Sequence, residues 1–406
     1  MFTFDNTTII ASVVLILVAV LTSLLNPFFR RVGIVAYGLP SSTNESDDTS
    51  TEEEPEEEGK ETIAELDDKA EEHPSLPPIS IIFTPHDNAQ ELAKNLPLYL
   101  NQDYPTDFQV IVVAPQNDHE TSDVLKRFAS NTHLYTTFIP ESSRYMSKKK
   151  LAITLGVKAA KYDWVLMADI CCFPTGDNWL QALARNCQEG KELVVGYTRY
   201  EDETPDYRRF ERHYLARYFM REYQHNRAYA CPFNALVFRK KTFLQAEGFR
   251  GNLKYIRGEY DFMVNKYAKD NLTFENSPEG TLIEEAPTDK VWLGGHLFYM
   301  ENRQHLERTT RHRLLPYIDQ TALHGNYVLQ CAALAVSYLL GMWTITAAIL
   351  SLILRLTIGK KALRRFDLDI PAWKIIPYEL AIAWKHLGYK LKYHRADKYD
   401  FISHKL

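Results

Sequence analysis

Short apolar runs alternate with amphipathic stretches through the middle of the chain. The apolar runs predict buried strands, and the stretches with apolar residues three or four positions apart predict helices. The predicted strands are residues 79–84, 109–114 and 164–168, and two of the predicted helices are residues 89–101 and 120–129. Because strands and helices alternate at this spacing, we expect a parallel sheet with right-handed crossovers. The pattern therefore predicts an α/β domain that opens at Pro77.

A long uncharged stretch precedes this domain. Residues 9–29 would span roughly 30 Å as a helix, about the thickness of the hydrocarbon core of a bilayer. A cleaved signal peptide is the alternative, but the amino-terminal flank lacks Lys and Arg and no small-residue cleavage site follows. We predict that residues 1–31 are a membrane anchor, and Arg30 and Arg31 then predict a cytoplasmic position for the domain that follows.

A second uncharged stretch follows the domain. Residues 327–354 are too long for one upright helix and carry Gly341 at their middle. We predict a transmembrane hairpin over residues 326–359, with Arg355 near the interface, where its side chain could snorkel to water. One tilted helix is the alternative, but it would leave the basic residues after position 359 outside the cell. Residues 360–406 are predicted to be basic and interfacial, with an amphipathic helix over residues 373–393.

Charge is distributed unevenly along the chain. The composition is 45% apolar and 12% aromatic, which is ample for a folded core. Residues 45–72 hold 15 Asp and Glu against two Lys, so the formal net charge of -5 leaves +8 on the rest of the chain. We predict that residues 32–76 are an acidic disordered linker, and a partner-binding acidic tail is the alternative. The basic remainder suits nucleotide diphosphates or an anionic membrane surface, and no motif for nucleic acid is present.

One carboxylate stands where ligands bind in open parallel sheets. A helix with Leu151, Leu155 and Ala159 at four-residue spacing precedes the strand at residues 164–168, and Asp169 follows that strand directly. The carboxyl ends of parallel strands are the usual ligand-binding edge, so Asp169 could meet a substrate or a metal ion. Capping of the next turn is the alternative role.

These residues resemble a known family. Lys149, Lys150 and Ala152, followed by Asp169-Ile170-Cys171, are similar to family 2 glycosyltransferases of the GT-A fold, which carry Gly-Lys-x-x-Ala-Leu-Asn and Asp-Ala-Asp. Residues 234–240 resemble the family's strand beside the acceptor, and Gly258-Glu259-Tyr260-Asp261-Phe262 stands where relatives carry Gly-Asp-Asp-Asp-Leu. The resemblance implies an α/β, Rossmann-like GT-A nucleotide-diphospho-sugar transferase domain over residues 77–315, with amino- and carboxyl-terminal transmembrane helices.

The resemblance also implies roles for individual residues. An inverting transferase needs a carboxylate to take the proton of the acceptor hydroxyl, and Glu259 and Asp261 are the acids of that motif; a helix-terminal carboxylate is the alternative. The implied donor-binding residues are Asp87, Asn117, Asp118, Lys149, Asp169, Arg303 and His305. Asp87, Asn117 and Asp118 have turn-forming alternatives. The implied cofactor is Mg²⁺ or Mn²⁺ on Asp169.

Four positions depart from the family pattern. Cys171 replaces the second Asp of the metal motif, and Pro115, Tyr260 and Gln304 stand at other positions tied to donor binding or catalysis. A thiol is a softer ligand than these hard cations prefer. Two functions therefore follow from the sequence. One is an inverting, membrane-bound glycosyltransferase that moves a sugar from a nucleotide-diphosphate sugar to an envelope glycan or lipid-linked acceptor. The other is a catalytically inactive subunit that binds or scaffolds in envelope polysaccharide assembly.

The predicted location follows from the anchor and from the resemblance. The protein is expected in the bacterial inner membrane as a multi-pass protein with a cytoplasmic catalytic domain. Its expected partners are a nucleotide-diphosphate sugar and a membrane lipid, lipid-linked or polymeric glycan acceptor.

Overall fold

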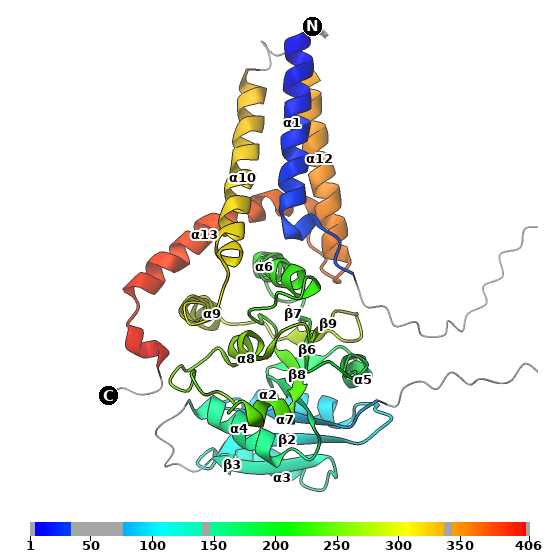
Figure 1. Ribbon diagram of the computed structural model, residues 1–406, viewed down its shortest axis with the longest axis vertical. Helices are drawn as coiled ribbons and strands as arrows, with labels where there is room; N and C mark the ends of the chain where they lie inside the picture. The colour runs from blue at the N-terminus through cyan, green and yellow to red at the C-terminus, as the bar shows by residue number, and fades with distance from the viewer. Residues whose placement is uncertain (1–4, 34–75, 140–146, 337–342, 403–406) are drawn as a thin grey trace, which may run out of the picture.

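A layered α/β domain carries a bundle of long helices at one end (Figure 1). The computed structural model describes residues 5–33, 76–139, 147–336 and 343–402. The predicted acidic linker at residues 32–76 falls almost entirely outside these ranges, as does Gly341.

The centre of the domain is a seven-stranded sheet in the order β3-β2-β1-β4-β8-β6-β9. Its strands are β1 Ile79–Phe83, β2 Phe108–Pro115, β3 Leu134–Ile139, β4 Trp164–Ala168, β6 Leu193–Gly196, β8 Ala235–Arg239 and β9 Leu272–Glu275. Neighbouring strands are parallel except for β8, which runs antiparallel to β4 and β6. Every side chain of β1 and β4 is buried, because helices cover both faces of the sheet.

Helices and a small second sheet surround this core. The helices of the domain are α2 Ala89–Leu100, α3 His119–Arg127, α4 Lys148–Ala159, α5 Trp179–Ala184, α6 Asp206–Gln224, α7 Lys240–Gln245, α8 Glu259–Tyr267 and α9 Asp289–Asn302. The second sheet pairs β5 Cys172–Pro174, β10 Leu282–Glu284 and β7 Thr198–Tyr200 in the order β5-β10-β7. Three residues separate the end of β4 from the start of β5, so this small sheet lies next to the edge where the main parallel strands finish.

The predicted strands and helices of the first half of the domain are confirmed to within two residues at each end. Strand β3 was not predicted, because two consecutive Thr interrupt its apolar residues; its Tyr135 and Phe138 are 46% and 41% exposed. Strand β3 is an edge strand and lacks the continuous apolar run of a buried strand. The aromatic stripe of α6 is part of the core: Phe210, Tyr214, Tyr218 and Tyr223 are all buried.

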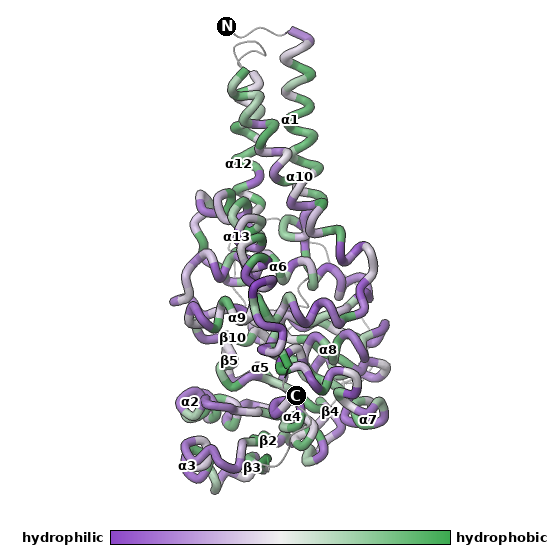
Figure 2. Tube along the Cα trace, turned by 90° about the vertical axis from the view of Figure 1, so that its left-hand side faces the viewer, coloured by the Kyte–Doolittle hydropathy of each residue, from purple (hydrophilic) through white to green (hydrophobic). Residues whose placement is uncertain are grey.

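Three long helices pack side by side beyond the domain (Figures 1 and 2). They are α1 Asn6–Leu25, α10 Thr310–Ala335 and α12 Trp343–Arg364. Of the residues that the structure describes, α1 and α12 form the two helices that are long and apolar enough to cross a membrane, by length and composition only. The uncharged stretch at residues 327–354 is divided between α10 and α12.

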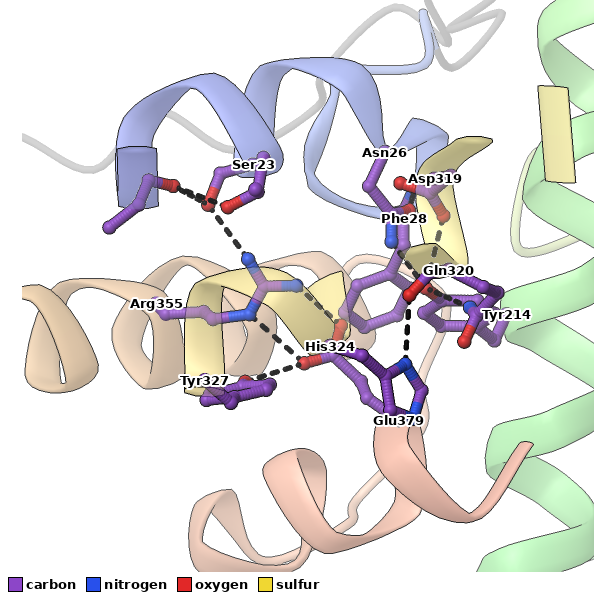
Figure 3. Close-up of polar contacts among 12 residues, drawn as sticks. Ser23, Asn26, Phe28, Tyr214, Asp319, Gln320, His324, Tyr327, Arg355 and Glu379 are labelled. Carbon is purple, nitrogen blue, oxygen red and sulfur yellow. Dashed lines mark hydrogen bonds and ion pairs between the residues drawn. The ribbon is translucent and has the colours of Figure 1, made fainter. Parts of the chain in front are cut away.

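A buried polar network joins this bundle to the helix that follows it, α13 Ile375–Arg395 (Figure 3). The guanidinium of Arg355 on α12 donates to both carboxylate oxygens of Glu379 on α13, at 3.0 and 2.9 Å, and to the hydroxyl of Ser23 on α1 at 3.0 Å. The Tyr327 hydroxyl donates to Glu379 at 3.3 Å. The expectation that Arg355 snorkels is therefore wrong, since its side chain is 3% exposed and has a buried carboxylate partner.

Candidate active site

The candidate site lies at the edge of the sheet where the parallel strands end. Asp169 follows β4 directly, as predicted, and Asn234 precedes the antiparallel strand β8. Because Ala168 pairs with Ala235, the two polar residues start from neighbouring positions of the sheet. The turn after Asp169 is held from α2: the Asn95 amide donates to the carbonyl of Ile170 at 2.8 Å. This hydrogen bond restrains the turn from which the Asp169 side chain projects.

Asp169 is paired with a lysine. The ammonium nitrogen of Lys149 on α4 lies 2.7 Å from the carboxylate of Asp169, and it lies 5.8 Å from the centre of the Tyr260 ring. Burial lowers the pKa of Lys149, but the negative charges of Asp169 and Glu259 outweigh it and raise that pKa above its ordinary value. The lysine is therefore charged at neutral pH, and its side chain remains about one third exposed.

The first turn of α8 contributes the predicted acids. Gly258 caps this helix with φ 92°, a left-handed conformation, and a Cβ there would lie 2.7 Å from the side chain of Asn302. Glu259 then begins the helix and is 3% exposed, with one carboxylate oxygen that has no hydrogen-bond partner within the described residues. The structure thus requires glycine at position 258 to start the helix that presents both acids.

Asp261 is the acid with the most perturbed environment. Its carboxylate accepts a hydrogen bond from the backbone N–H of Cys231 at 2.9 Å. Burial is the main cause that raises the pKa of Asp261 to about 7; the Cys231 hydrogen bond lowers it and the charge of Glu259 raises it. Since Glu259 acts on both Lys149 and Asp261, the structure brings Lys149, Asp169, Glu259 and Asp261 into one electrostatically coupled region.

The sequence did not single out Glu284, which extends this region. Its carboxylate lies 2.7 Å from the guanidinium of Arg212 on α6 and accepts a hydrogen bond from the Asn234 amide at 2.8 Å. Burial raises the pKa of Glu284, Arg212 lowers it, and the charge of Asp169 raises it further. Glu284 stands on the three-residue strand β10, too short for an alternating pattern to reveal it. Only Asn234 had a sequence signal, through the motif at residues 234–240.

Lys150 holds the segment that leads into α8. Its side chain is fully buried and donates to the backbone carbonyls of Tyr255 and Arg257. Burial is the main cause that lowers the pKa of this ammonium to about 8. The two neighbouring lysines therefore differ in role, because Lys149 faces the carboxylates while Lys150 positions the loop before Gly258.

Arg303 and His305 lie at the carboxyl end of α9. The Arg303 guanidinium lies 5.8 Å from the centre of the Tyr299 ring, and the charge of Asp261 acts on that same tyrosine. His305 stacks on Tyr255, with ring centres 4.2 Å apart. Arg303 thus neighbours a tyrosine on which Asp261 also acts, while His305 packs on the loop that Lys150 holds.

The three other predicted donor residues occupy surface turns. Asp118 caps α3, since its carboxylate accepts from the backbone N–H of Thr121 at 3.0 Å. Asp87 has φ 57°, is 89% exposed and pairs with His86 at 3.2 Å, and Asn117 is exposed after β2. Within the part of the chain that the structure describes, no hydrogen bond or ion pair joins them to Asp169 or Lys149. Their contact with a nucleotide stays a prediction.

The side chains around Asp169 do not by themselves form a cage for a hard cation. Among the described residues there is no group of three or more His, Cys, Asp and Glu side chains arranged to hold a metal ion. Asp169 is already paired with Lys149, and the neighbouring position holds the thiol of Cys171 in place of a second carboxylate. Mg²⁺ and Mn²⁺ prefer oxygen ligands, so the donor set of this chain fits them poorly.

Comparison with known proteins identifies the domain. Residues 80–242, from β1 into α7, match the model of the family described as Glycosyl transferase family 2. Residues 80–242 are a family 2 glycosyltransferase domain. This domain, with its mixed GT-A-like sheet, makes the chain an enzyme of the glycosyltransferase class. No curated protein matches the chain significantly.

Solved structures give weaker likenesses to the glycosyltransferase chain. A mannosyltransferase from Pyrobaculum calidifontis, in complex with GDP-Man and Mn²⁺, is 17% identical with a TM-score of 0.47, over 77% of this chain and 87% of that chain. TarS from S. aureus, residues 1–349 in complex with UDP-GlcNAc, is 11% identical with a TM-score of 0.40, over 78% of this chain and 91% of that chain. Likenesses at this level define neither substrate nor cofactor for this chain.

Proposed function

We propose that the protein is a membrane-bound, inverting glycosyltransferase that moves a sugar from a nucleotide-diphosphate sugar to an envelope glycan or lipid-linked acceptor. The observation that carries this proposal is the electrostatic coupling of Lys149, Asp169, Glu259 and Asp261 at the end of the family 2 domain's parallel strands. Such an arrangement supplies a fixed cation for a leaving diphosphate and a carboxylate for an acceptor hydroxyl.

The proposed step is a single displacement at the anomeric carbon. Asp261 takes the proton of the acceptor hydroxyl while the acceptor oxygen forms a bond to the anomeric carbon. The bond from that carbon to the diphosphate oxygen breaks, and the nucleoside diphosphate leaves with the electron pair. Lys149 stabilises the negative charge of the leaving diphosphate, and Asp169 holds the lysine at 2.7 Å. Arg303 is proposed as a further diphosphate or acceptor contact.

We expect the rate of transfer to rise with pH and to level off near pH 7. The base must be deprotonated to accept a proton, and burial raises the pKa of Asp261 to about 7. Below that pH the rate should fall about tenfold per unit, since one proton blocks the base. Initial rates of nucleoside diphosphate release between pH 5 and 9 measure this. A profile that stays flat down to pH 5 would contradict the assignment of Asp261.

The proposed location rests on the long helices. We place α1, the carboxyl-terminal part of α10 and α12 in a bilayer, so that α10 leads out and α12 returns; this leaves Arg30, Arg31 and the basic residues after position 359 on the side of the catalytic domain. By the positive-inside tendency this side is cytoplasmic, where nucleotide sugars are made. We further propose that the membrane is a bacterial inner membrane. The proposed acceptor is a membrane lipid, a lipid-linked sugar or a polymeric glycan.

Calorimetric titration of the purified full chain with UDP and GDP tests the proposal, with and without Mn²⁺. Micromolar binding to the unaltered chain supports a donor site, and its response to Mn²⁺ shows whether the pair of Lys149 and Asp169 suffices without the metal. Cys171→Asp restores the second carboxylate of the family motif and is the matched variant. Nucleotide binding by this variant but not by the unaltered chain would instead favour the catalytically inactive subunit. The observation that favours this second function is the thiol of Cys171 in place of a metal-binding carboxylate.

A further inference from the structure

A basic groove lies where α12 leaves the bundle. It encloses about 690 Å³. Its walls are Ile353, Leu356, Thr357, Lys360, Lys361, Arg364, Arg365 and Ala372. The first three belong to the apolar part of α12 and the next four to its end and the residue after it, so the groove has an apolar half and a cationic half. We propose that this groove binds the phosphate headgroup of an anionic membrane lipid, with an acyl chain against the apolar half.

The cationic half contains side chains that have no acidic partner within the described ranges. Lys360 is engaged, since its ammonium lies 2.6 Å from the carboxylate of Asp369 and donates to the carbonyl of Ile370 at 2.9 Å. Within the described ranges, the side chains of Lys361, Arg364 and Arg365 make neither a hydrogen bond nor an ion pair. Lys361 and Arg364 are exposed and Arg365 is half-buried. Three uncompensated cations around one groove fit a phosphate.

The region around the groove adds to the positive potential. Arg217 on α6 is buried and donates to the backbone carbonyls of Pro27 and Phe28, at 3.4 Å each. The pKa of Arg217 is lowered to about 10, chiefly by burial and also by the charge of Arg365, against an opposing contribution from Tyr197. The acids near the groove include Asp369, which pairs with Lys360, Asp206, which pairs with Lys374, and Asp367, which is exposed on the loop after α12. The cations outnumber these acids.

The apolar half distinguishes a lipid from a free anion. The wall residue Ile353 is 54% exposed and continues into an exposed apolar face of α12, where Leu350 and Leu354 are 58% and 48% exposed. On the other side, Trp373 follows the wall residue Ala372 and is 70% exposed. Exposed Trp is typical of the level of lipid headgroups. A free phosphate would use only the cations, whereas a phospholipid would cover both halves.

Binding of short-chain lipids to the full chain in neutral detergent tests this proposal. The probes are dioctanoyl phosphatidic acid, dioctanoyl phosphatidylcholine and inorganic phosphate. The variant neutralises Lys361, Arg364 and Arg365 together as Gln, and the control neutralises Arg127, Lys158 and Lys241, which are exposed on α3, α4 and α7 at the far end of the domain (Figure 1). We expect the variant to bind phosphatidic acid about tenfold or more weakly, and the control to bind it normally.

Three results would overturn the proposal. They are unchanged affinity in the groove variant, equal affinity for phosphatidylcholine, and displacement of the lipid by equimolar inorganic phosphate. Because the substituted side chains make neither a hydrogen bond nor an ion pair within the described ranges, the variant should unfold at nearly the same temperature as the unaltered chain. The inference rests on the proposed membrane placement of α12 but not on catalysis. Nucleotide binding by the same preparations separates its failure from failure of the proposed enzyme.

Discussion

Replacing Asp261 by Asn is expected to lower the rate of sugar transfer by about 10²-fold or more while nucleotide binding is retained. General bases contribute roughly 10²–10⁴-fold to such reactions, and Asn keeps the shape of Asp without its ability to take a proton. The side-chain oxygen of Asn can still accept from the backbone N–H of Cys231, which Asp261 accepts at 2.9 Å. The substitution therefore tests the charge of this side chain rather than the fold.

The measurement is the rate of nucleoside diphosphate release with a saturating acceptor, together with calorimetric binding of the nucleotide. Glu259→Gln is the informative comparison, because Glu259 is the other acid of the motif. Asp270→Asn, at an exposed position beyond α8, is the matched surface control. If Asp261→Asn keeps its rate while Glu259→Gln loses it, the base is Glu259 and our assignment is wrong.

Replacing Glu379 by Ala is expected to destabilise the protein by about 3–5 kcal/mol. This carboxylate is fully buried and is the acidic partner of Arg355, which is itself 3% exposed. Its removal would leave a guanidinium charge inside the junction of α1, α10, α12 and α13 without its carboxylate partner, although the Ser23 hydroxyl would still accept from it (Figure 3). Desolvation of an unpaired charge is costly, so the junction should loosen.

A double variant separates the cost of an unpaired charge from the value of the pair. Arg355→Met with Glu379→Leu removes both charges and keeps apolar volume, so its unfolding temperature should lie much closer to that of the unaltered chain. Thermal unfolding in a neutral detergent is the measurement, and Glu189→Ala, at an exposed position, is the control. Equal loss in the single and double variants would show that the junction needs the ion pair itself.

Part of the candidate site could be predicted from local sequence. The apolar run of β4 and the polar residue after it placed Asp169 at a strand end, and motif resemblance selected Lys149, Glu259 and Asp261. What could not be predicted is which residues approach them. Glu284 is 115 positions beyond Asp169 in the chain, and no periodicity links the two. Its role depends on Arg212 from α6 and Asn234 from the start of β8, which only the packed sheets bring together.

Arg355 shows the same limit, because its partner is distant in sequence, whereas Asp118 shows an interaction that is local in sequence. A lone arginine in an apolar stretch predicted a snorkelling side chain, because a sequence window of one helix contains no partner for it. The partner, Glu379, lies on another helix, α13. Asp118 had a donor-binding and a turn-forming interpretation, and the structure shows the carboxylate capping α3. A cap is a local interaction, so its geometry was available within four residues of sequence.

The sequence by itself determined the alternation of strands and helices in the first half of the domain apart from β3, the long apolar stretches at both ends and the family that the domain resembles. These properties depend on periodicity and on the length of apolar runs, and both are local. Only the tertiary structure decided that Lys149 pairs with Asp169, that Glu284 joins them and that Arg355 is neutralised by Glu379. Ion pairs and pKa values depend on distance in space and on burial, which chain folding sets between residues that are far apart in sequence.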